Sequence, residues 1–243
     1  MGHYNLIKLN ATNSTNDKVK MLLKSKKIKP GDIVWADYQY KGRGQYKNKW
    51  NSSRGKNLLI SLYREFKGLK SKQVSYINFA ISLSVIKTIE HYISSDNYIK
   101  WPNDILSGNK KISGILIENL YKGKKLMGSI VGVGINVNQI TFPKNFNASS
   151  MKIIMKNDYS LKKLLHDFLD IFRYNLFLYK DLDLLKRDFN KSLFLKNKLI
   201  EYEINGNTKK GKIVGLNDYE RFQILNLAGV KETPKISDVK IIY

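Results

Sequence analysis

The sequence of 243 residues contains no cysteine, which excludes disulfide bonds, thiolate metal sites and a cysteine nucleophile. It also lacks a run of about 18 consecutive apolar residues, the length that a membrane span needs. The first residues, Met1 to Tyr4, do not begin with the basic region and apolar core of a signal peptide. We therefore expect a cytoplasmic protein that does not enter a membrane.

Acidic residues are scarce, since 20 Asp and Glu stand against 43 Lys and Arg, and the formal net charge is +23. Such an excess favours association with polyanions, including nucleic acid, acidic proteins and phosphate-bearing substrates. The lysines are scattered along the chain and do not form one basic block. We interpret the charge as a property that bears on solubility and association, and not as a sign of the fold.

Internal repeats and linkers rich in Pro, Gly or Ser are also absent, so a domain boundary has to be inferred from a change of periodicity. Helical and strand patterns alternate from Asn13 to about Lys196, and only short β runs follow. The sequence therefore predicts a large domain over residues 1–195 and a small β-barrel domain over residues 196–243.

Periodicity predicts the individual elements. The expected helices cover 16–26, 73–93 and 161–179, where apolar residues recur at the 3.6-residue period. The expected strands cover 32–39, 58–63, 98–106, 111–119 and 126–138 in the large domain, and 199–204, 212–216, 222–227 and 239–243 in the small one. Gly-containing turns at 107–108 and 122–123 predict that the strands from 98 to 138 form a meander.

The segment from Gly42 to Trp50 is the first that composition does not explain; it reads GRGQYKNKW. Gly42 and Gly44 let the backbone approach a ligand closely, Arg43 can bind an anion in fork geometry, and Trp50 can meet a flat ring. The segment matches neither common phosphate-binding glycine pattern, and a solvated hairpin is the alternative. We expect the stretch from Lys41 to Trp50 to be mobile without ligand, with Arg43 and the backbone of Gly42 and Gly44 finding partners only when a ligand is bound.

A second segment, Lys100 to Asp104, ends an apolar strand. Pro102 indicates a strand edge or an interruption, and Asn103 and Asp104 supply oxygen atoms that can orient a lysine or hold Mg²⁺. If the flanking strands pair as a hairpin, Lys111 returns toward Asp104, and a carboxylate and an ammonium face one site. On so basic a chain, a solvated lysine is the alternative.

A third segment, Gly132 to Asn138, carries spaced glycines in an otherwise apolar strand. Such glycines indicate close approach by another backbone or by a ligand, and Asn136 offers an amide that can read an adenine edge. The alternative is that the glycines only allow two strands to cross at close distance, with no ligand involved.

Together these segments resemble the catalytic domain of biotin protein ligases over about residues 10–140. The resemblance rests on five motifs in the family's order: Ser14-Thr15-Asn16; Gln39 ahead of Gly42-Arg43-Gly44 and Trp50; Lys100-Trp101-Pro102-Asn103-Asp104; Lys111 with Ser113-Gly114-Ile115-Leu116; and Gly134-Ile135-Asn136. It implies an α+β fold of the class II synthetase-like type, a mixed β-sheet backed by helices, followed by a small C-terminal SH3-like β-barrel. It also implies ATP-dependent activation of biotin to biotinyl-5′-AMP and transfer to a lysine of a biotin carboxyl carrier protein domain.

The resemblance further implies residue roles. The biotin-binding residues would be Ser14, Thr15, Asn16, Gln39, Gly42, Arg43, Lys111, Gly114 and Leu116. The ATP-binding residues would be Arg43, Gln45, Trp50, Asn103, Lys111 and Asn136, with Trp50 and Asn136 at the adenine. Lys111, Arg43 and Asp104 are the candidate catalytic residues, because carboxylate attack on a phosphate brings anions together and needs a cation between them. Mg²⁺ would be carried mainly by the phosphates, with Asp104 as its one candidate ligand, so no dedicated metal site is expected.

The chain also departs from the family's pattern. Members often carry Arg, Gly and Arg where this chain has Gln45, Lys47 and Asn48, which predicts a weaker grip on the adenylate. Larger members place a helix-turn-helix domain ahead of the catalytic part, and about a dozen residues precede Ser14 here. We therefore expect no sequence-specific binding of nucleic acid.

Two other functions stay open at this point. A lipoate protein ligase or octanoyl-type acyltransferase shares the fold, but Ser14, Thr15 and Gln39 would be left unpaired against an aliphatic ligand. A basic nucleic-acid-binding module would use the charge and the terminal barrel. The sequence does not decide the oligomeric state, and a homodimer is one option.

Overall fold

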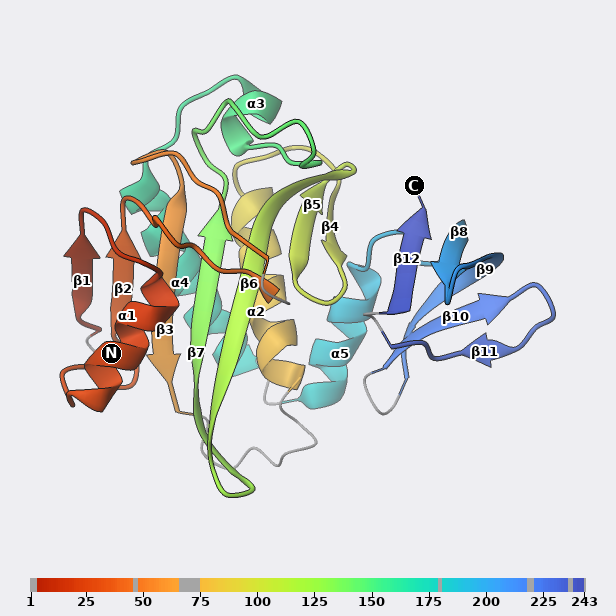
Figure 1. Cartoon of the computed structure of the whole chain (residues 1–243), viewed down its shortest axis with the longest axis horizontal. Helices are drawn as coiled ribbons and strands as arrows, with labels where there is room; N and C mark the ends of the chain where they lie inside the picture. Colours follow the sequence, from red (N-terminus) through yellow and green to blue (C-terminus); the bar gives the residue numbers. More distant parts are fainter. Residues whose placement is uncertain are drawn as a thin grey trace.

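The computed structural model describes residues 4–45, 48–65, 75–178, 181–217, 221–235 and 238–242. A seven-stranded mixed sheet in the order β1-β2-β3-β7-β6-β5-β4 forms its centre, and a five-stranded sheet lies beside it (Figure 1). The strands of the central sheet are β1 (Leu6–Leu9), β2 (Ile33–Ala36), β3 (Leu58–Arg64), β4 (Asn97–Lys100), β5 (Asp104–Ser107), β6 (Lys110–Lys122) and β7 (Lys125–Ile135). β1 pairs with β2 in parallel, and the other neighbours are antiparallel.

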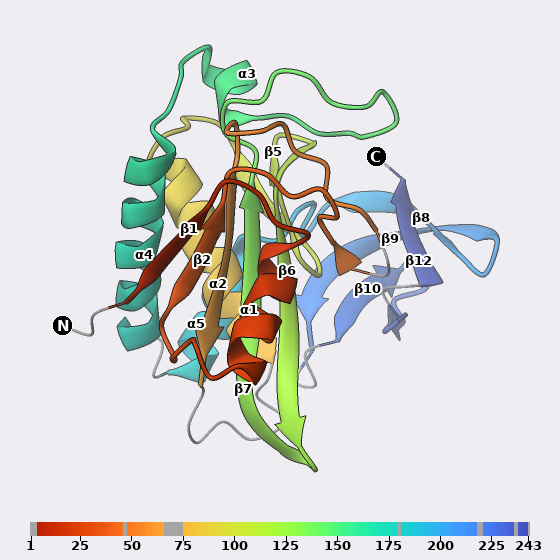
Figure 2. The ribbon, with the colours of Figure 1, turned by 60° about the vertical axis from the view of Figure 1, so that its left-hand side comes forward.

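Helices cover both faces of this sheet. They are α1 (Thr15–Lys24), α2 (Ser75–Glu90), α3 (Met151–Met155), α4 (Leu161–Leu178) and α5 (Leu182–Lys191). α2, α4 and α5 lie behind the sheet and bury Phe79, Phe168 and Phe189 completely, whereas α1 crosses the opposite face (Figures 1 and 2). α1 packs Val19 and Leu22 against the sheet in a second, smaller core. The expected mixed sheet backed by helices is thus confirmed.

The segment expected as one strand over 98–106 is instead a hairpin. β4 and β5 pair in antiparallel fashion, with Lys100 opposite Asp104 and Trp101 to Asn103 in the turn. A proline has no N–H to give to a sheet ladder, so Pro102 ends β4 rather than lying within a longer strand. The predicted interruption at Pro102 is therefore confirmed, and the single strand is wrong.

The C-terminal part is a separate antiparallel sheet in the order β11-β10-β9-β8-β12. Its strands are β8 (Leu199–Ile204), β9 (Asn207–Leu216), β10 (Phe222–Asn226), β11 (Lys231–Glu232) and β12 (Val239–Ile242). Tyr202, Ile213 and Ile224 are fully buried in it. Asn205 and Gly206 both have positive φ angles and form the expected β8–β9 turn, since such a two-residue turn matches the twist of a hairpin. This sheet agrees with the small C-terminal domain that the sequence predicts.

Across the part of the chain that the structure describes, no helix combines the length and the apolar character needed to cross a bilayer.

Candidate active site

A cavity of about 610 Å³ opens on the face of the central sheet that carries α1. The N-terminus of α1, the segment that follows β2, the β4–β5–β6 hairpins and strand β7 surround it, and β12 of the C-terminal sheet completes the wall. The described lining consists of Ser14, Thr15, Asn16, Gln39, Arg43, Gly44, Gln45, Asn48, Lys49, Trp50, Ile60, Lys100, Trp101, Pro102, Asn103, Asp104, Lys111, Gly114, Ile115, Leu116, Gly132, Val133, Gly134, Val239, Lys240 and Ile241.

Glycines form the floor of this cavity. Gly114 on β6 lies opposite Gly134 on β7, and Gly132 lies one pleat further along the same face. A Cβ atom at Gly134 would come within 2.7 Å of the Trp50 ring, and one at Gly132 would overlap the Asn16 side chain. The spaced glycines therefore mark close approach by side chains of other segments, as the sequence predicts.

Trp50 lies against this glycine floor. Its indole sits beside both Gly114 and Gly134, and the Lys111 ammonium is 5.5 Å from the ring centroid. Its Nε1 is buried and has no hydrogen-bond partner among the described residues. The ring therefore forms an apolar side wall next to Lys111.

Polar side chains gather at the α1 side of the cavity. Ser14, Thr15 and Asn16 are 2–4% exposed. The backbone N–H and the Oγ1 of Thr15 both donate to Gln39 Oε1, at 2.7 and 3.0 Å. Ser61 Oγ lies 2.6 Å from Thr15 Oγ1 and 2.5 Å from Asn16 Oδ1. The predicted Ser14-Thr15-Asn16 and Gln39 motifs, 24 residues apart, thus form one network.

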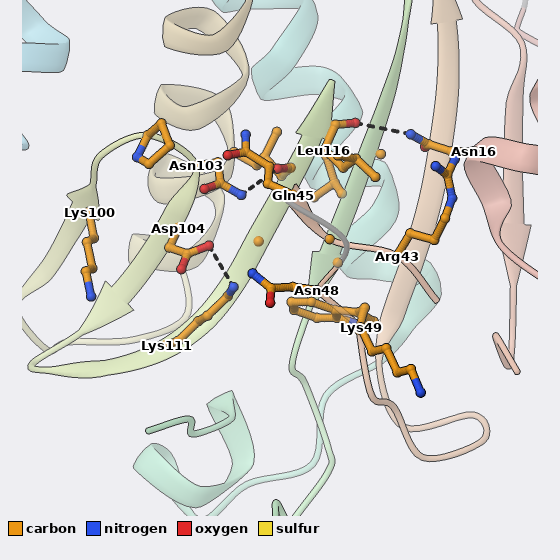
Figure 3. Close-up of a pocket in the computed structure, with 18 of the residues that line it drawn as sticks. Asn16, Arg43, Gln45, Asn48, Lys49, Lys100, Asn103, Asp104, Lys111 and Leu116 are labelled. Atoms are coloured by element: carbon orange, nitrogen blue, oxygen red, sulfur yellow. Dashed lines mark hydrogen bonds and ion pairs between the residues drawn. The ribbon is translucent and has the colours of Figure 1, made fainter. Parts of the chain in front are cut away.

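Lys111 and Asp104 meet on the opposite side, as the sequence predicts. The Lys111 ammonium is 2.7 Å from Asp104 Oδ1, and the two side chains are 33% and 25% exposed. Figure 3 shows this pair across the pocket from Asn16. Asn103 stabilises the turn ahead of Asp104, because its Nδ2 donates to the Ile115 carbonyl at 2.9 Å and its own carbonyl accepts from the Ile115 N–H.

Arg43 lines the cavity, but its guanidinium is bound to carboxylates. Nη2 donates to Asp17 Oδ1 at 2.6 Å and to the Glu118 oxygens at 3.0 and 3.1 Å. The neighbouring backbone is paired as well, since the Gly44 N–H donates to the Asn48 carbonyl at 2.7 Å. The expectation that Arg43 finds partners only with a ligand is therefore wrong, because α1 and β6 bring two acidic side chains to it.

Two expected site residues lie outside the described lining. Gly42 is buried, and a Cβ atom there would be 2.5 Å from the Trp50 carbonyl oxygen. Asn136 is 3% exposed, and its Nδ2 donates to the Ser149 carbonyl at 3.0 Å. The Asn136 Oδ1 and the Ser149 Oγ are buried without a partner among the described residues. Ser149 in turn bonds to the backbone of Lys111, so Asn136 lies close behind that residue.

The sequence also missed part of the site. Val239, Lys240 and Ile241 of β12 line the cavity, about 130 residues after Lys111. No local pattern in these residues indicates where the C-terminal sheet packs. Tyr46 and Lys47, which belong to the expected loop motif, lie outside the described residues.

The carboxylates near the cavity fit a Mg²⁺ ion that is held mainly by substrate phosphates rather than by protein side chains alone. Within the described ranges, no three His, Asp or Glu side chains come together to hold a metal. Asp104 is the one carboxylate in the described lining. Mg²⁺ is usually held by one or two carboxylates, waters and substrate phosphates, and a single Asp104 fits that donor set.

Residues 9–136 match the model of the biotin/lipoate A/B protein ligase family. The chain is similar to the bifunctional ligase/repressor BirA of Bacillus subtilis (strain 168), at 32% identity over 126 residues that cover 52% of this chain and 38% of that protein. It is also similar to biotin–protein ligase 2 of Arabidopsis thaliana, at 36% identity over 116 residues that cover 45% of this chain and 34% of the relative. The matched part thus spans well under two thirds of these relatives.

The structure resembles the biotin protein ligase from Aquifex aeolicus in complex with biotin and ATP. The TM-score is 0.79 at 28% sequence identity, and the match covers 98% of each chain. The family model alone spans more than half of the sequence. The chain therefore belongs to the biotin/lipoate A/B protein ligase family.

Proposed function

We propose that this chain is a biotin protein ligase that activates biotin with ATP to biotinyl-5′-AMP and transfers it to a lysine of a biotin carboxyl carrier protein domain. The observation that carries the proposal is one cavity with a buried polar network on one side and the Lys111–Asp104 pair on the other. The similar Aquifex structure holds biotin and ATP, which supports both substrates.

The polar side suits the ureido ring of biotin. Ser14, Thr15 and Gln39 present hydroxyl and amide groups, and the backbone of Gly42 adjoins the Gln39 side chain. An aliphatic head group would displace water from these polar groups without replacing the lost hydrogen bonds. Each polar group left unpaired costs about 1–3 kcal/mol of binding free energy. We therefore propose that the site selects biotin over octanoyl or lipoyl chains.

Lys111 suits the activation step. Attack of the biotin carboxylate on the α-phosphate of ATP brings two anions together and releases pyrophosphate. An ammonium already in place between them stabilises the charge that develops in the transition state. Asp104, at 2.7 Å, keeps that ammonium oriented toward the cavity. Mg²⁺ bound by the phosphates, with Asp104 as the nearby carboxylate, would add to this charge neutralisation.

We propose the adenine ring to contact Trp50 and Asn136. The Trp50 indole presents an apolar surface beside Lys111. The Asn136 Oδ1 is a buried acceptor without a described partner, and an adenine amino group is a donor that would satisfy it. Because Asn136 lies outside the described lining, this contact requires the side chains between it and the cavity to shift.

In the transfer step the amine of the acceptor lysine attacks the carbonyl of the mixed anhydride, forms an amide and displaces AMP. The site has to exclude water until the acceptor arrives, since water would hydrolyse the adenylate. We place this ATP-consuming reaction in the cytoplasm.

Biotin-dependent exchange of labelled pyrophosphate into ATP tests the proposal on the purified chain. We expect exchange with biotin and not with lipoate or octanoate. Exchange that depends on lipoate or octanoate would identify the chain as the related acyl ligase. Salt-sensitive DNA binding without any exchange would instead support a nucleic-acid-binding module.

A further inference from the structure

Glu118 lies on β6 outside the cavity lining formed by the described residues, yet it contacts two segments that build that lining. Its side chain is 21% exposed. It is the acidic centre of a group that we call the Glu118 cluster, defined as Asn16, Asp17, Lys20, Arg43 and Glu118.

The first segment is α1. Asn16 Nδ2 donates to Glu118 Oε2 at 2.8 Å, and Lys20, one turn further along the helix, donates to Oε1 at 2.6 Å. Asn16 also donates to the Leu116 carbonyl at 3.3 Å. The carboxylate thus holds the start of α1, with its polar cavity residues, against β6.

The second segment is the one from Gly42 to Trp50. Arg43 Nη2 donates to both oxygens of Glu118, and the same nitrogen also donates to Asp17 of α1. The cluster balances two cations with two anions, so the half-buried carboxylate is not left unpaired. Because Arg43 pairs with Lys49 in an isolated β-bridge, a fixed Arg43 also fixes Lys49, the residue next to Trp50.

From these contacts we infer that Glu118 is a positioning residue: it joins α1, β6 and the Gly42–Trp50 segment, and Arg43 acts through it rather than as a phosphate ligand. The inference rests on the proposed function, because the walls that the cluster joins are the proposed biotin site. Glu118 touches no substrate in this scheme. Its effect is on the affinity for biotin, through the spacing between the Thr15–Gln39 network and Trp50.

The lowered pKa of Glu118 agrees with a carboxylate that is charged near neutral pH. Burial alone would raise the pKa of Glu118, but hydrogen bonds from Lys20, Asn16 and Arg43 and the charge of Arg43 outweigh it and lower the pKa below its ordinary value.

The test compares the wild type with Glu118→Gln, Arg43→Gln, the double variant and a control, Glu201→Gln. The control makes the same chemical change at an exposed ion pair with Lys210 on the C-terminal sheet. We would measure kcat and KM for biotin in pyrophosphate exchange, the melting temperature, and hydrogen exchange of the Gly44 and Trp50 amides without ligand.

We expect each single variant to raise KM for biotin about tenfold with little change in kcat, as loss of one charge-assisted hydrogen bond predicts. The effect of the double variant should be smaller than the sum of the two single effects, because both changes remove the Arg43–Glu118 interaction. Protection of the Gly44 and Trp50 amides should fall in all three, while the control matches the wild type. Arg43→Gln, at a more exposed residue, gives the same test if Glu118→Gln does not fold.

A large fall in kcat for Arg43→Gln with normal values for Glu118→Gln would show that the guanidinium serves the phosphates, and the inference would be overturned. Unchanged amide protection in Glu118→Gln would overturn it as well. The hydrogen-exchange measurement needs no substrate. The variants could lose amide protection while the wild type shows no biotin-dependent pyrophosphate exchange. That result would support the positioning role of Glu118 and contradict the proposed function.

Discussion

Lys111 and Gly114, three residues apart on β6, both face the cavity, and a Cβ atom at Gly114 would lie 3.3 Å from the Lys111 ammonium. Residues three apart on a regular strand point to opposite faces. The β5–β6 register shifts between Ile105 and Leu106, so that Leu106 pairs with Lys111 while Ile105 pairs with Ser113. This β-bulge turns Lys111 to the same face as the glycine floor and toward Asp104.

Replacement of Lys111 should therefore remove the proposed chemistry and leave the fold intact. We expect Lys111→Ala to lower biotin-dependent pyrophosphate exchange by roughly a hundredfold or more, as loss of one oxyanion donor does. The exposed neighbour Lys110 provides the control, since Lys110→Ala removes the same charge from the same strand. Near-normal exchange in Lys111→Ala, with a melting temperature like that of the control, would exclude Lys111 from the mechanism.

Asp104 should act through Lys111. We expect Asp104→Asn to lower kcat about tenfold, because an amide no longer holds the ammonium by charge at 2.7 Å. The double variant with Lys111→Ala should be no slower than Lys111→Ala alone. A titration of Mg²⁺ separates the two proposed roles of Asp104. A raised Mg²⁺ requirement in Asp104→Asn would assign it to the metal, and an unchanged requirement would leave only the orienting role.

The glycine floor should be essential for binding rather than for folding. A methyl group at Gly134 comes within 2.7 Å of the Trp50 ring, so Gly134→Ala has to displace that side wall. We expect biotin affinity, measured by calorimetry, to fall at least tenfold, while overpacking costs about 1–3 kcal/mol of stability. The control is Gly123→Ala, where φ is +59° and a Cβ meets nothing within 4 Å. It should cost about 1–2 kcal/mol through backbone strain and leave biotin affinity unchanged.

The strongly periodic elements of this fold were predictable from the sequence, and the elements set by packing were not. α4 carries its apolar residues along one side at the helical period, and α2 is an apolar stretch far longer than a strand, so both helices could hardly be missed. β1 has only four residues, too few for a periodic pattern that can be recognised. α5 was missed although its ten residues are amphipathic, with Leu185 and Phe189 buried four residues apart. Asp181 does cap α5 by accepting from the Asp183 and Leu184 N–H groups, a local signal that was present.

The site was predictable where its residues belong to motifs. Ser14, Gln39, Asp104 and Lys111 were named from the sequence and line one cavity. The partners of Arg43 were not predictable, because Asp17 and Glu118 stand 26 and 75 residues away from it. Charges so far apart in the chain meet only through the packing of α1 against the sheet. The periodicity of a single sequence does not show which residues distant in the chain come into contact.

Acid should weaken the Glu118 cluster. The pKa of Glu118 is lowered in the folded protein, so its carboxylate contributes stability at every pH above its unfolded value, about 4.3. That contribution is lost as the pH falls through the folded pKa. We expect the difference in free energy of unfolding between wild type and Glu118→Gln to be constant from pH 8 to about pH 5 and to shrink below that. A difference that grows on acidification would contradict the sign of this pKa shift.

Gln45 and Asn48 stand where family members often carry arginines, and both line the cavity. Figure 3 shows the Asn48 amide on the same side of the pocket as Lys111, where phosphates are proposed to lie. Neutral amides cannot give the charged, bidentate grip of a guanidinium, so this chain should hold biotinyl-5′-AMP more loosely than relatives that keep the arginines. Arg43 does not replace them, because its guanidinium is bound to Asp17 and Glu118.

Introducing both arginines, as Gln45→Arg and Asn48→Arg, should therefore slow the release of the adenylate. Each charge-assisted hydrogen bond gained contributes about 1.5–3 kcal/mol at most, so one new bond predicts a dissociation rate roughly ten- to a hundredfold lower. A double change to lysine at the same positions controls for charge alone, since an ammonium lacks the planar fork of a guanidinium. Dissociation of biotinyl-5′-AMP, followed by stopped flow, measures the difference. An unchanged or faster rate in the arginine variant would mean that another group, such as Lys49, already holds the phosphate.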